Sequence, residues 1–287
     1  AATVLRNKMI AINGGNNLLD TCGTGGDGLG TFNISSMAAL SVASTGIKVE
    51  KHGNRAVSSL SGSADFYSHI GIPASLPPQK AQKMLCDTGF AFLFAPLYHS
   101  ALHFAANSRK DLAIKTIFNL LGPLLNPAKA EYQVVGVFDP VFMKSMAQSL
   151  VRLGAKKVMV IHGKDGGDEL SISHPTIIVE ASFDNPQLKE WVLDPKDLGL
   201  PHYTGKELIG STPQENVHIA LNLFSQKTDS ALCDSVALNG GAALYIMKKA
   251  PSIKEGYQRV KEEILSGRVF FFIQKLKKYA EEQNVSY

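Results

Sequence analysis

Five glycines stand close together in residues 20–36, DTCGTGGDGLGTFNISS, where the residue types could hold an anion. Glycine lacks a Cβ atom, so this backbone can adopt positive φ angles and point several N–H groups at one ligand. Asn33, Ser35 and Ser36 follow, and the alanine-rich residues after them should form a helix whose N-terminus attracts negative charge. We therefore predict a phosphate-binding loop, although a flexible surface turn would also be rich in glycine. The stretch matches neither the P-loop pattern nor a clean dinucleotide fingerprint.

Two further polar loops follow predicted strands. Residues 51–59, KHGNRAVSS, carry two cations, an amide and several hydroxyls, and residues 163–169, GKDGGDE, end on the adjacent carboxylates Asp168 and Glu169. Hard oxygen ligands beside a phosphate pocket suit Mg²⁺. Taken alone, each loop could be an ordinary polar surface loop. Together they predict a pocket for a polyanion with a metal ion.

The elements that position these loops follow a β-α-β order. A strand at 18–21, a helix at about 36–44 and a strand at 47–50 predict a parallel sheet, with loops at the carboxyl ends of its strands, where ligands bind in such sheets. Further strands are expected at 90–96, 132–138 and 157–162, and helices at 3–11, 64–70, 79–88, 141–153, 214–225, 234–249 and 253–280 with a break at Gly267. We expect a hairpin at 172–181, a loop and turn at 191–200, and a helical excursion from the α/β body at 97–125, closed by a return marked with proline.

Composition excludes several classes of protein. With 287 residues, 45% hydrophobic and 19% charged, the chain is expected to be globular rather than disordered. A formal net charge of +4 with dispersed basic residues argues weakly for an anionic small ligand and hardly at all for a nucleic-acid partner, and no apolar run reaches the length of a membrane span. Cys22, Cys86 and Cys233 form no CxxC pair, which with the lack of a signal peptide favours the cytoplasm, and Cys22 is expected to be a buried residue at a strand end rather than a nucleophile.

The ordered motifs closely resemble those of anthranilate phosphoribosyltransferases. They are GTGGD with TFNISS, KHGNRAVSS with SGSAD, YHSALHFAANSRKDLAIKTIFNLLGPLLNP, HGKDGGDELS, and TPQEN with LNGGAALY, and together they extend over nearly the whole chain. The resemblance implies a magnesium-dependent glycosyltransferase. It would move the 5-phosphoribosyl group of phosphoribosyl pyrophosphate (PRPP) to the amine of anthranilate, releasing pyrophosphate, in the second committed step of tryptophan biosynthesis.

The resemblance also implies a fold and an assembly. We expect an α/β protein: a large α/β domain with a mainly parallel central sheet flanked by helices, plus a small helical domain through which the family forms homodimers. Residues 14–96 and 127–287 would form the α/β domain and residues 97–126 the helical excursion, while residues 1–13 would be the remnant of a helical domain whose N-terminal helices are missing or shortened. The chain departs from the family at Ser100, where proline is usual, and at Tyr67 and Ser68, where the family usually has Leu-Glu.

Carried over motif by motif, the resemblance implies these site residues. The PRPP-binding positions are Gly23, Gly26, Asp27, Thr31, Asn33, Ile34, Ser35, Ser36, Lys51, His52, Gly53, Asn54, Arg55, Ala56, Val57, Ser58, Ser59 and Ser63. The metal ligands are Ser35, Asp168 and Glu169, expected to hold two Mg²⁺ ions, and anthranilate would contact Gly23, Asn54 and Arg109. No residue acts as acid, base or nucleophile: Arg109, Lys51 and Asn54 position the substrates, and His99 and His103 are expected to pack or to line the pocket.

Three other functions fit parts of the pattern. A pyrimidine nucleoside phosphorylase shares the architecture and the chemistry at the ribose C1, although Arg109 and the KHGN loop fit anthranilate better. A non-catalytic relative could bind nucleic acid, which would make binding sensitive to salt. A free-standing metabolite-binding protein is the third alternative.

Overall fold

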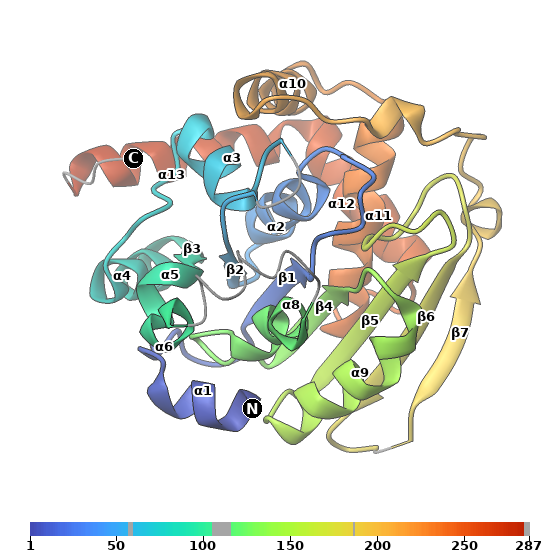
Figure 1. Cartoon of the computed structure of the whole chain (residues 1–287). Helices are drawn as coiled ribbons and strands as arrows, with labels where there is room; N and C mark the ends of the chain where they lie inside the picture. The colour runs from blue at the N-terminus through green and yellow to red at the C-terminus, as the bar shows by residue number, and fades with distance from the viewer. Residues whose placement is uncertain (57–59, 105–115, 186, 284–287) are drawn as a thin grey trace.

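A seven-stranded sheet forms the centre of the molecule in the computed structural model, which describes residues 1–56, 60–104, 116–185 and 187–283 (Figure 1). Its strand order is β3-β2-β1-β4-β5-β6-β7; the first five strands are parallel to one another, β6 pairs antiparallel with β5, and β7 pairs antiparallel with β6. The strands are β1 (Leu19–Gly23), β2 (Val49–Gly53), β3 (Phe90–Phe94), β4 (Tyr132–Gly136), β5 (Lys157–Gly163), β6 (Thr176–Ser182) and β7 (Lys189–Leu193). The predicted α/β class and mainly parallel sheet are confirmed.

Helices cover both faces of this sheet. On one face, α2 packs on β1 and β2 and α11 on β4 and β5, with α12 and α13 behind them; on the other, α9 packs on β5 and β6 (Figure 1). The longer helices are α2 (Ile34–Ser44), α3 (Ser63–Ile70), α4 (Pro78–Thr88), α9 (Met143–Arg152), α10 (Pro213–Gln226), α11 (Ala231–Ile246), α12 (Ile253–Ser266) and α13 (Arg268–Glu282). The shorter ones are α1 (Ala2–Lys8), α5 (Ala95–Tyr98), α6 (Ser100–His103), α8 (Ile117–Leu121), and the 3-10 helices η1 (Gly122–Leu125), η2 (Pro140–Phe142), η3 (Pro195–Leu198) and η4 (Lys206–Leu208).

The alternation of side chains along the strands divides the core in two. In β5, Met159 and Ile161 face the cluster under α2 and α11, whereas Val158 and Val160 face the cluster under α9. Both sets are apolar because a central parallel strand is covered on both faces. Burying each side chain of this size contributes roughly 1.5–3 kcal/mol, so the sheet is fixed from both sides.

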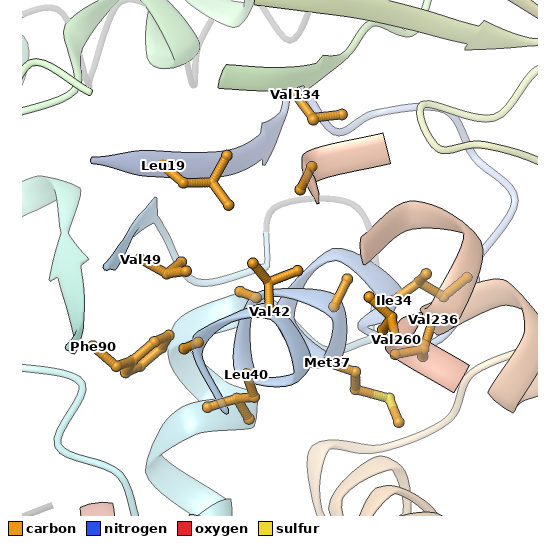
Figure 2. Close-up of a cluster of buried hydrophobic side chains, with 14 of the residues drawn as sticks. Leu19, Ile34, Met37, Leu40, Val42, Val49, Phe90, Val134, Val236 and Val260 are labelled. Carbon is orange, nitrogen blue, oxygen red and sulfur yellow. The ribbon is translucent and has the colours of Figure 1, made fainter. Parts of the chain in front are cut away.

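Helix α2 lies at the centre of the larger cluster. Ile34 and the residues from Ser36 to Ala43 are buried, whereas Ser35 is only partly buried. Figure 2 shows Met37, Leu40 and Val42 among side chains of the strands and of α11 and α12. A helix that is apolar on every side must be covered on every side. Its N-terminus is thereby held in one place, directly after the glycine loop.

Three local predictions are corrected by the structure. Strand β2 runs three residues further than 47–50 suggested, so Lys51, His52 and Gly53 lie in the strand and not in the following loop. The hairpin expected at 172–181 does not form within that segment: β6 is a single strand that pairs with β5.

The third concerns residues 191–200, where a loop and turn were expected. Trp191 lies in β7, where it pairs with Ile178 of β6, and its indole Nε1 donates to Glu180 Oε1 at 2.9 Å. Among the described residues of 97–125, the expected helix consists of the short pieces α5, α6, α8 and η1. The domain boundaries at residues 13, 96 and 126 stay predictions.

Candidate active site

A crevice is expected where β1 and β4 end side by side. From β1 the sheet continues to β2 and β3 in one direction and to β4 and β5 in the other, and ligands bind at the carboxyl ends of strands where the order reverses in this way. The last residues of the two strands, Gly23 and Gly136, are paired in register. The glycine loop leaves from the first of these ends.

Asp168 fills the space between these two strand ends. A Cβ atom at Gly23 would overlap its carboxylate, and a Cβ atom at Gly136 would overlap its backbone carbonyl. Asp168 Oδ2 accepts a hydrogen bond from the backbone N–H of Gly25 at 2.9 Å. Gly25 has a φ of 60°, in the left-handed region that favours glycine. Both strand-end glycines are therefore required for the carboxylate to reach the loop.

Glu169 lies against the N-terminus of α2. Its Oε1 accepts a hydrogen bond at 3.0 Å from the N–H of Ser35, the second residue of that helix. Burial, reinforced by the charge of Asp168, raises the pKa of Glu169 well above its usual range, and burial with the charge of Asp27 raises the pKa of Asp168 to about 6. The structure thus brings together three acidic groups that repel one another, Asp27, Asp168 and Glu169. Such a cluster is typical of a site that binds a cation.

Lys51 supplies a buried cation near this acidic pair. It is 3% exposed, and its Nζ donates to the carbonyl of Thr21 and lies 3.4 Å from Ser35 Oγ. The ammonium group therefore sits between β1 and the start of α2, where its charge acts on both Asp168 and Glu169. A buried lysine in this place favours binding of a phosphate at the helix end.

The loop after β2 is held by Asp65 of α3. Its carboxylate pairs with Arg55 at 2.9 Å and accepts from the N–H groups of Ala56 and Gly62. The Arg55 side chain is 59% exposed. Arg55, one of the predicted PRPP ligands, thus forms an ion pair with Asp65. Asn54 is exposed, and its carbonyl accepts from Ser63 Oγ at 3.2 Å.

Buried and backbone-bound positions make up most of the remaining predicted site. The Ile34 side chain is 2% exposed in the core, and Ser36 is buried too, so these two residues offer a ligand little beyond their backbone. Thr31 forms a β-bridge with Ile209. Asn33 bonds to Ser61 and to Asn216.

His52 and His99 form a buried pair rather than a ligand-facing one. Their Nε2 atoms lie 3.1 Å apart, and the rings meet edge to face. Burial lowers the pKa of His52 to about 3, with the charge of His99 contributing, and burial lowers the pKa of His99 to about 4. Both rings are therefore neutral at ordinary pH. His99 was expected to pack or to line the pocket, and in the structure it is buried against His52.

Some predicted residues lie outside the described part of the chain. These are Val57, Ser58, Ser59 and Arg109, and the His103 side chain is also not described.

Several polar residues that hold the site were missed from the sequence. Asn239 of α11 accepts from Leu170 N at 2.9 Å and donates to Leu170 O at 3.1 Å, which fixes the residue directly after Glu169. Asn126 donates to the buried Asp20 at 2.8 Å, which ties β1 to the return from residues 97–125. The signal for each was a single polar residue in an apolar stretch.

The donor set fits magnesium. Asp168 and Glu169 offer carboxylate oxygens and Ser35 a hydroxyl, and Mg²⁺ typically takes one or two carboxylates together with substrate phosphates. Within the described residues, no cluster of three or more histidine, cysteine or acidic side chains is arranged to bind a metal by itself. Such a donor set would leave coordination positions for an anionic ligand.

The fold and this site define a glycosyltransferase. Residues 15–270 match the family described as "Glycosyl transferase family, a/b domain". The chain is 42% identical over 273 residues to anthranilate phosphoribosyltransferase of Geobacillus kaustophilus, covering 95% of this chain and 80% of the relative. It is 45% identical over 252 residues to that of Clostridium kluyveri, covering 88% and 74%. The chain belongs to the anthranilate phosphoribosyltransferase family, as the motifs predicted.

Solved structures agree with this assignment. The enzyme from Thermus thermophilus superposes with a TM-score of 0.90 at 38% identity, covering 98% of this chain and 83% of that one. The Saccharomyces cerevisiae enzyme in complex with PRPP and Mg superposes with a TM-score of 0.88 at 26% identity, covering 98% and 79%. In the described part of this chain, none of the helices has the length and apolar character to cross a bilayer.

Proposed function

We propose that this chain transfers the 5-phosphoribosyl group of PRPP to the amine of anthranilate, forming N-(5-phosphoribosyl)anthranilate and pyrophosphate. The observation that carries the proposal is the meeting of the glycine loop, the start of α2 and the Asp168–Glu169 pair at the ends of β1 and β4. A relative from Saccharomyces cerevisiae is described with PRPP and Mg, and another structure of it with 4-fluoroanthranilate. Nothing comparable favours the phosphorylase or the nucleic-acid alternative.

The reaction requires charge to be stabilised on the departing pyrophosphate. Backbone N–H groups of the glycine loop and the buried Lys51 ammonium are preorganised donors for that charge. Asp168, Glu169 and Ser35 would hold Mg²⁺, two ions in our proposal, and the metal would neutralise phosphate charge. We propose no protein nucleophile, because the arylamine of anthranilate is already nucleophilic.

Orientation of the acceptor is the second requirement. Holding the amine in line with C1 can contribute roughly 7–11 kcal/mol to lowering the barrier. We propose that the Arg109 guanidinium binds the anthranilate carboxylate, because a planar fork matches a planar carboxylate. Asn54 and Gly23 would complete the acceptor pocket.

We also propose a homodimer formed through the helical part of the chain. The short elements α1, α5 and α6 lie side by side, and α8 leads into η1, which contacts α1 (Figure 1). Several apolar side chains on or next to these elements are exposed. They are Val4, Ile10, Leu97, Phe104 and Ile117. Apolar side chains grouped in this way are typical of an interface. The cytoplasmic location expected from the three cysteines stays a prediction.

A fluorescence time course tests the proposed reaction. Anthranilate fluorescence should fall only when PRPP and Mg²⁺ are both present, while phosphorolysis of pyrimidine nucleosides should be absent. Light scattering on the same sample gives the assembly state. Arg109→Ala should raise the KM for anthranilate far more than the KM for PRPP, with Arg152→Ala on the exposed surface of α9 as the matched control. Loss of fluorescence without PRPP, or DNA binding that weakens with salt, would overturn the assignment.

A further inference from the structure

A distant segment lies along the glycine loop. Phe32 N donates to Leu208 O at 3.0 Å, and Gly210 N donates to Gly30 O at 2.8 Å. A Cβ atom at Gly210 would stand only 2.7 Å from Thr31 O, so the two backbones approach more closely than another residue type allows. Residues 208–210 thus run along one side of the glycine loop and hold its last residues by backbone hydrogen bonds.

That segment leads directly into α10, which begins with the TPQEN motif. Thr212 caps the helix by accepting from Glu215 N, and Asn216 follows in the first turn, 1% exposed. Asn216 Nδ2 donates to Asn33 Oδ1 at 3.1 Å, and Asn216 Oδ1 accepts from Ser211 N at 2.8 Å. Because Ser211 N can only donate, it fixes which end of the Asn216 amide is oxygen. The Asn216 NH₂ group must therefore face Asn33.

The same reasoning fixes the orientation of the Asn33 amide. Its Oδ1 accepts from Asn216 Nδ2 at 3.1 Å and from Ser61 Oγ at 2.9 Å, which uses both lone pairs of that oxygen. Its Nδ2 donates once, to Ser61 O at 3.1 Å. One N–H of the Asn33 amide has no further partner among the described residues. Asn33 can therefore offer a ligand a donor but not an acceptor.

We propose that Asn216 is a positioning residue for PRPP, acting through Asn33. By donating to Asn33 Oδ1, it turns the amide so that an N–H is available for the anionic substrate. It also joins three chain segments, residues 30–33, residues 61–62 and α10, into one support for the glycine loop. The inference rests on the proposed function, because the anion that Asn33 serves is taken to be PRPP.

Asn216→Asp is the most direct test. A carboxylate at this position accepts but cannot donate, so it would attract Asn33 Nδ2 and turn Oδ1 toward the substrate, where it repels phosphate. We expect the Kd and KM for PRPP to rise about tenfold or more, since a buried polar group loses its partner, while the KM for anthranilate stays within about twofold. Asn222→Asp is the matched control: it adds the same charge to α10, where Asn222 bonds only to His218 among the described residues.

A double-mutant cycle separates positioning from simple stability. Asn33→Ala should weaken PRPP binding by itself, and adding Asn216→Asp to it should cause little further loss, because the residue through which Asn216 acts is gone. Asn216→Ala, which removes the donor without adding charge, serves if Asn216→Asp does not fold. Additive losses, or an unchanged Kd for PRPP in a folded Asn216 variant, would overturn the inference. If the wild type and Asn222→Asp bind no PRPP in calorimetry, the proposed function itself fails, so the two failures are distinguishable.

Discussion

Glu169 occupies the anion position at the start of α2, because its carboxylate takes the hydrogen bond from Ser35 N at 3.0 Å. Asp168 does the same for Gly25 N in the glycine loop. Two of the donors expected to hold a phosphate are thus satisfied by the protein's own carboxylates. A substrate phosphate with magnesium would take these donors and give the carboxylates a cation in exchange.

Replacing the Asp168–Glu169 pair by neutral amides should raise the stability of the protein while it lowers the activity. Burial raises the pKa of both groups, so their charged forms are costly in the folded protein. Replacing Asp168→Asn together with Glu169→Gln should therefore raise the free energy of unfolding at pH 7.5, by an amount on the order of 2 kcal/mol. The same variant should lose most of its turnover and require more Mg²⁺.

Urea unfolding and magnesium titration of the initial rate measure the two effects. Asp184→Asn, at an exposed position, is the control that should change neither. A variant that keeps the wild-type magnesium dependence would remove the carboxylate pair from the site.

Gly136 should tolerate no side chain, although Gly122 should. A Cβ atom at Gly136 would overlap the Asp168 carbonyl, which cannot move without displacing the carboxylate from Gly25. Gly122 has no atom within 4 Å of the added Cβ position and a helical φ of −48°. We expect Gly136→Ala to cost roughly 1–3 kcal/mol and most activity, and Gly122→Ala to gain up to about 1 kcal/mol. Thermal unfolding and initial rates of both variants measure these effects. Equal effects of Gly136→Ala and Gly122→Ala would refute the close approach of the Asp168 carbonyl to Gly136.

Local composition predicted the glycine loop and its place in the fold. Its glycines stand close together in the sequence, and the β-α-β order alone places its start at the carboxyl edge of a parallel sheet. The end of β2 was not predictable in the same way. Lys51 and His52 have the residue types of a loop, but they extend the strand because they pair with Phe92 and Leu93 of β3. Their side chains bond to Thr21 and His99, which are far away in the sequence.

The supporting amides were unpredictable for a similar reason. Asn33 and Asn216 are 183 residues apart, and Leu170 and Asn239 are 69 residues apart. The sequence around each asparagine does not show which distant residue it will bond to. Their motifs were visible in the sequence, but the hydrogen bonds that give them a purpose depend on the complete fold.

The His52–His99 pair should make the protein sensitive to acid. With pKa values lowered to about 3 and about 4, neither ring binds a proton readily in the folded state, whereas the unfolded chain does so below about pH 6.5. Stability should therefore fall as the pH decreases from 6.5 towards 4, by roughly 2 kcal/mol at pH 5 for each imidazole. Urea unfolding at pH 7.0 and 5.0 measures this loss.

A matched pair of variants assigns that loss to the buried rings. His52→Asn with His99→Asn should lose much less stability between pH 7.0 and 5.0 than the wild type. His202→Asn removes an exposed imidazole and should behave like the wild type. If the double variant keeps the full acid sensitivity, other groups are responsible.

Glu50 should have the opposite dependence on pH. Its side chain is fully buried on β2, and within the described residues neither carboxylate oxygen has a hydrogen-bond partner, as is also the case for the hydroxyl of Tyr98. Burial, with the charge of Asp20 as the second cause, raises the pKa of Glu50 well above its usual range. The folded protein then holds a proton that the unfolded chain releases above about pH 4.5, so this group lowers stability as the pH rises.

Glu50→Gln should remove that component, because an amide has no proton to release in this range. The difference in free energy of unfolding between Glu50→Gln and the wild type should therefore grow in favour of the variant by at least about 1 kcal/mol between pH 5.5 and 8.5. Urea unfolding at several pH values measures the difference, with exposed Glu281→Gln as the control. A difference that is constant with pH would mean that Glu50 is ionised in the folded protein, with a cation close enough to compensate for its burial.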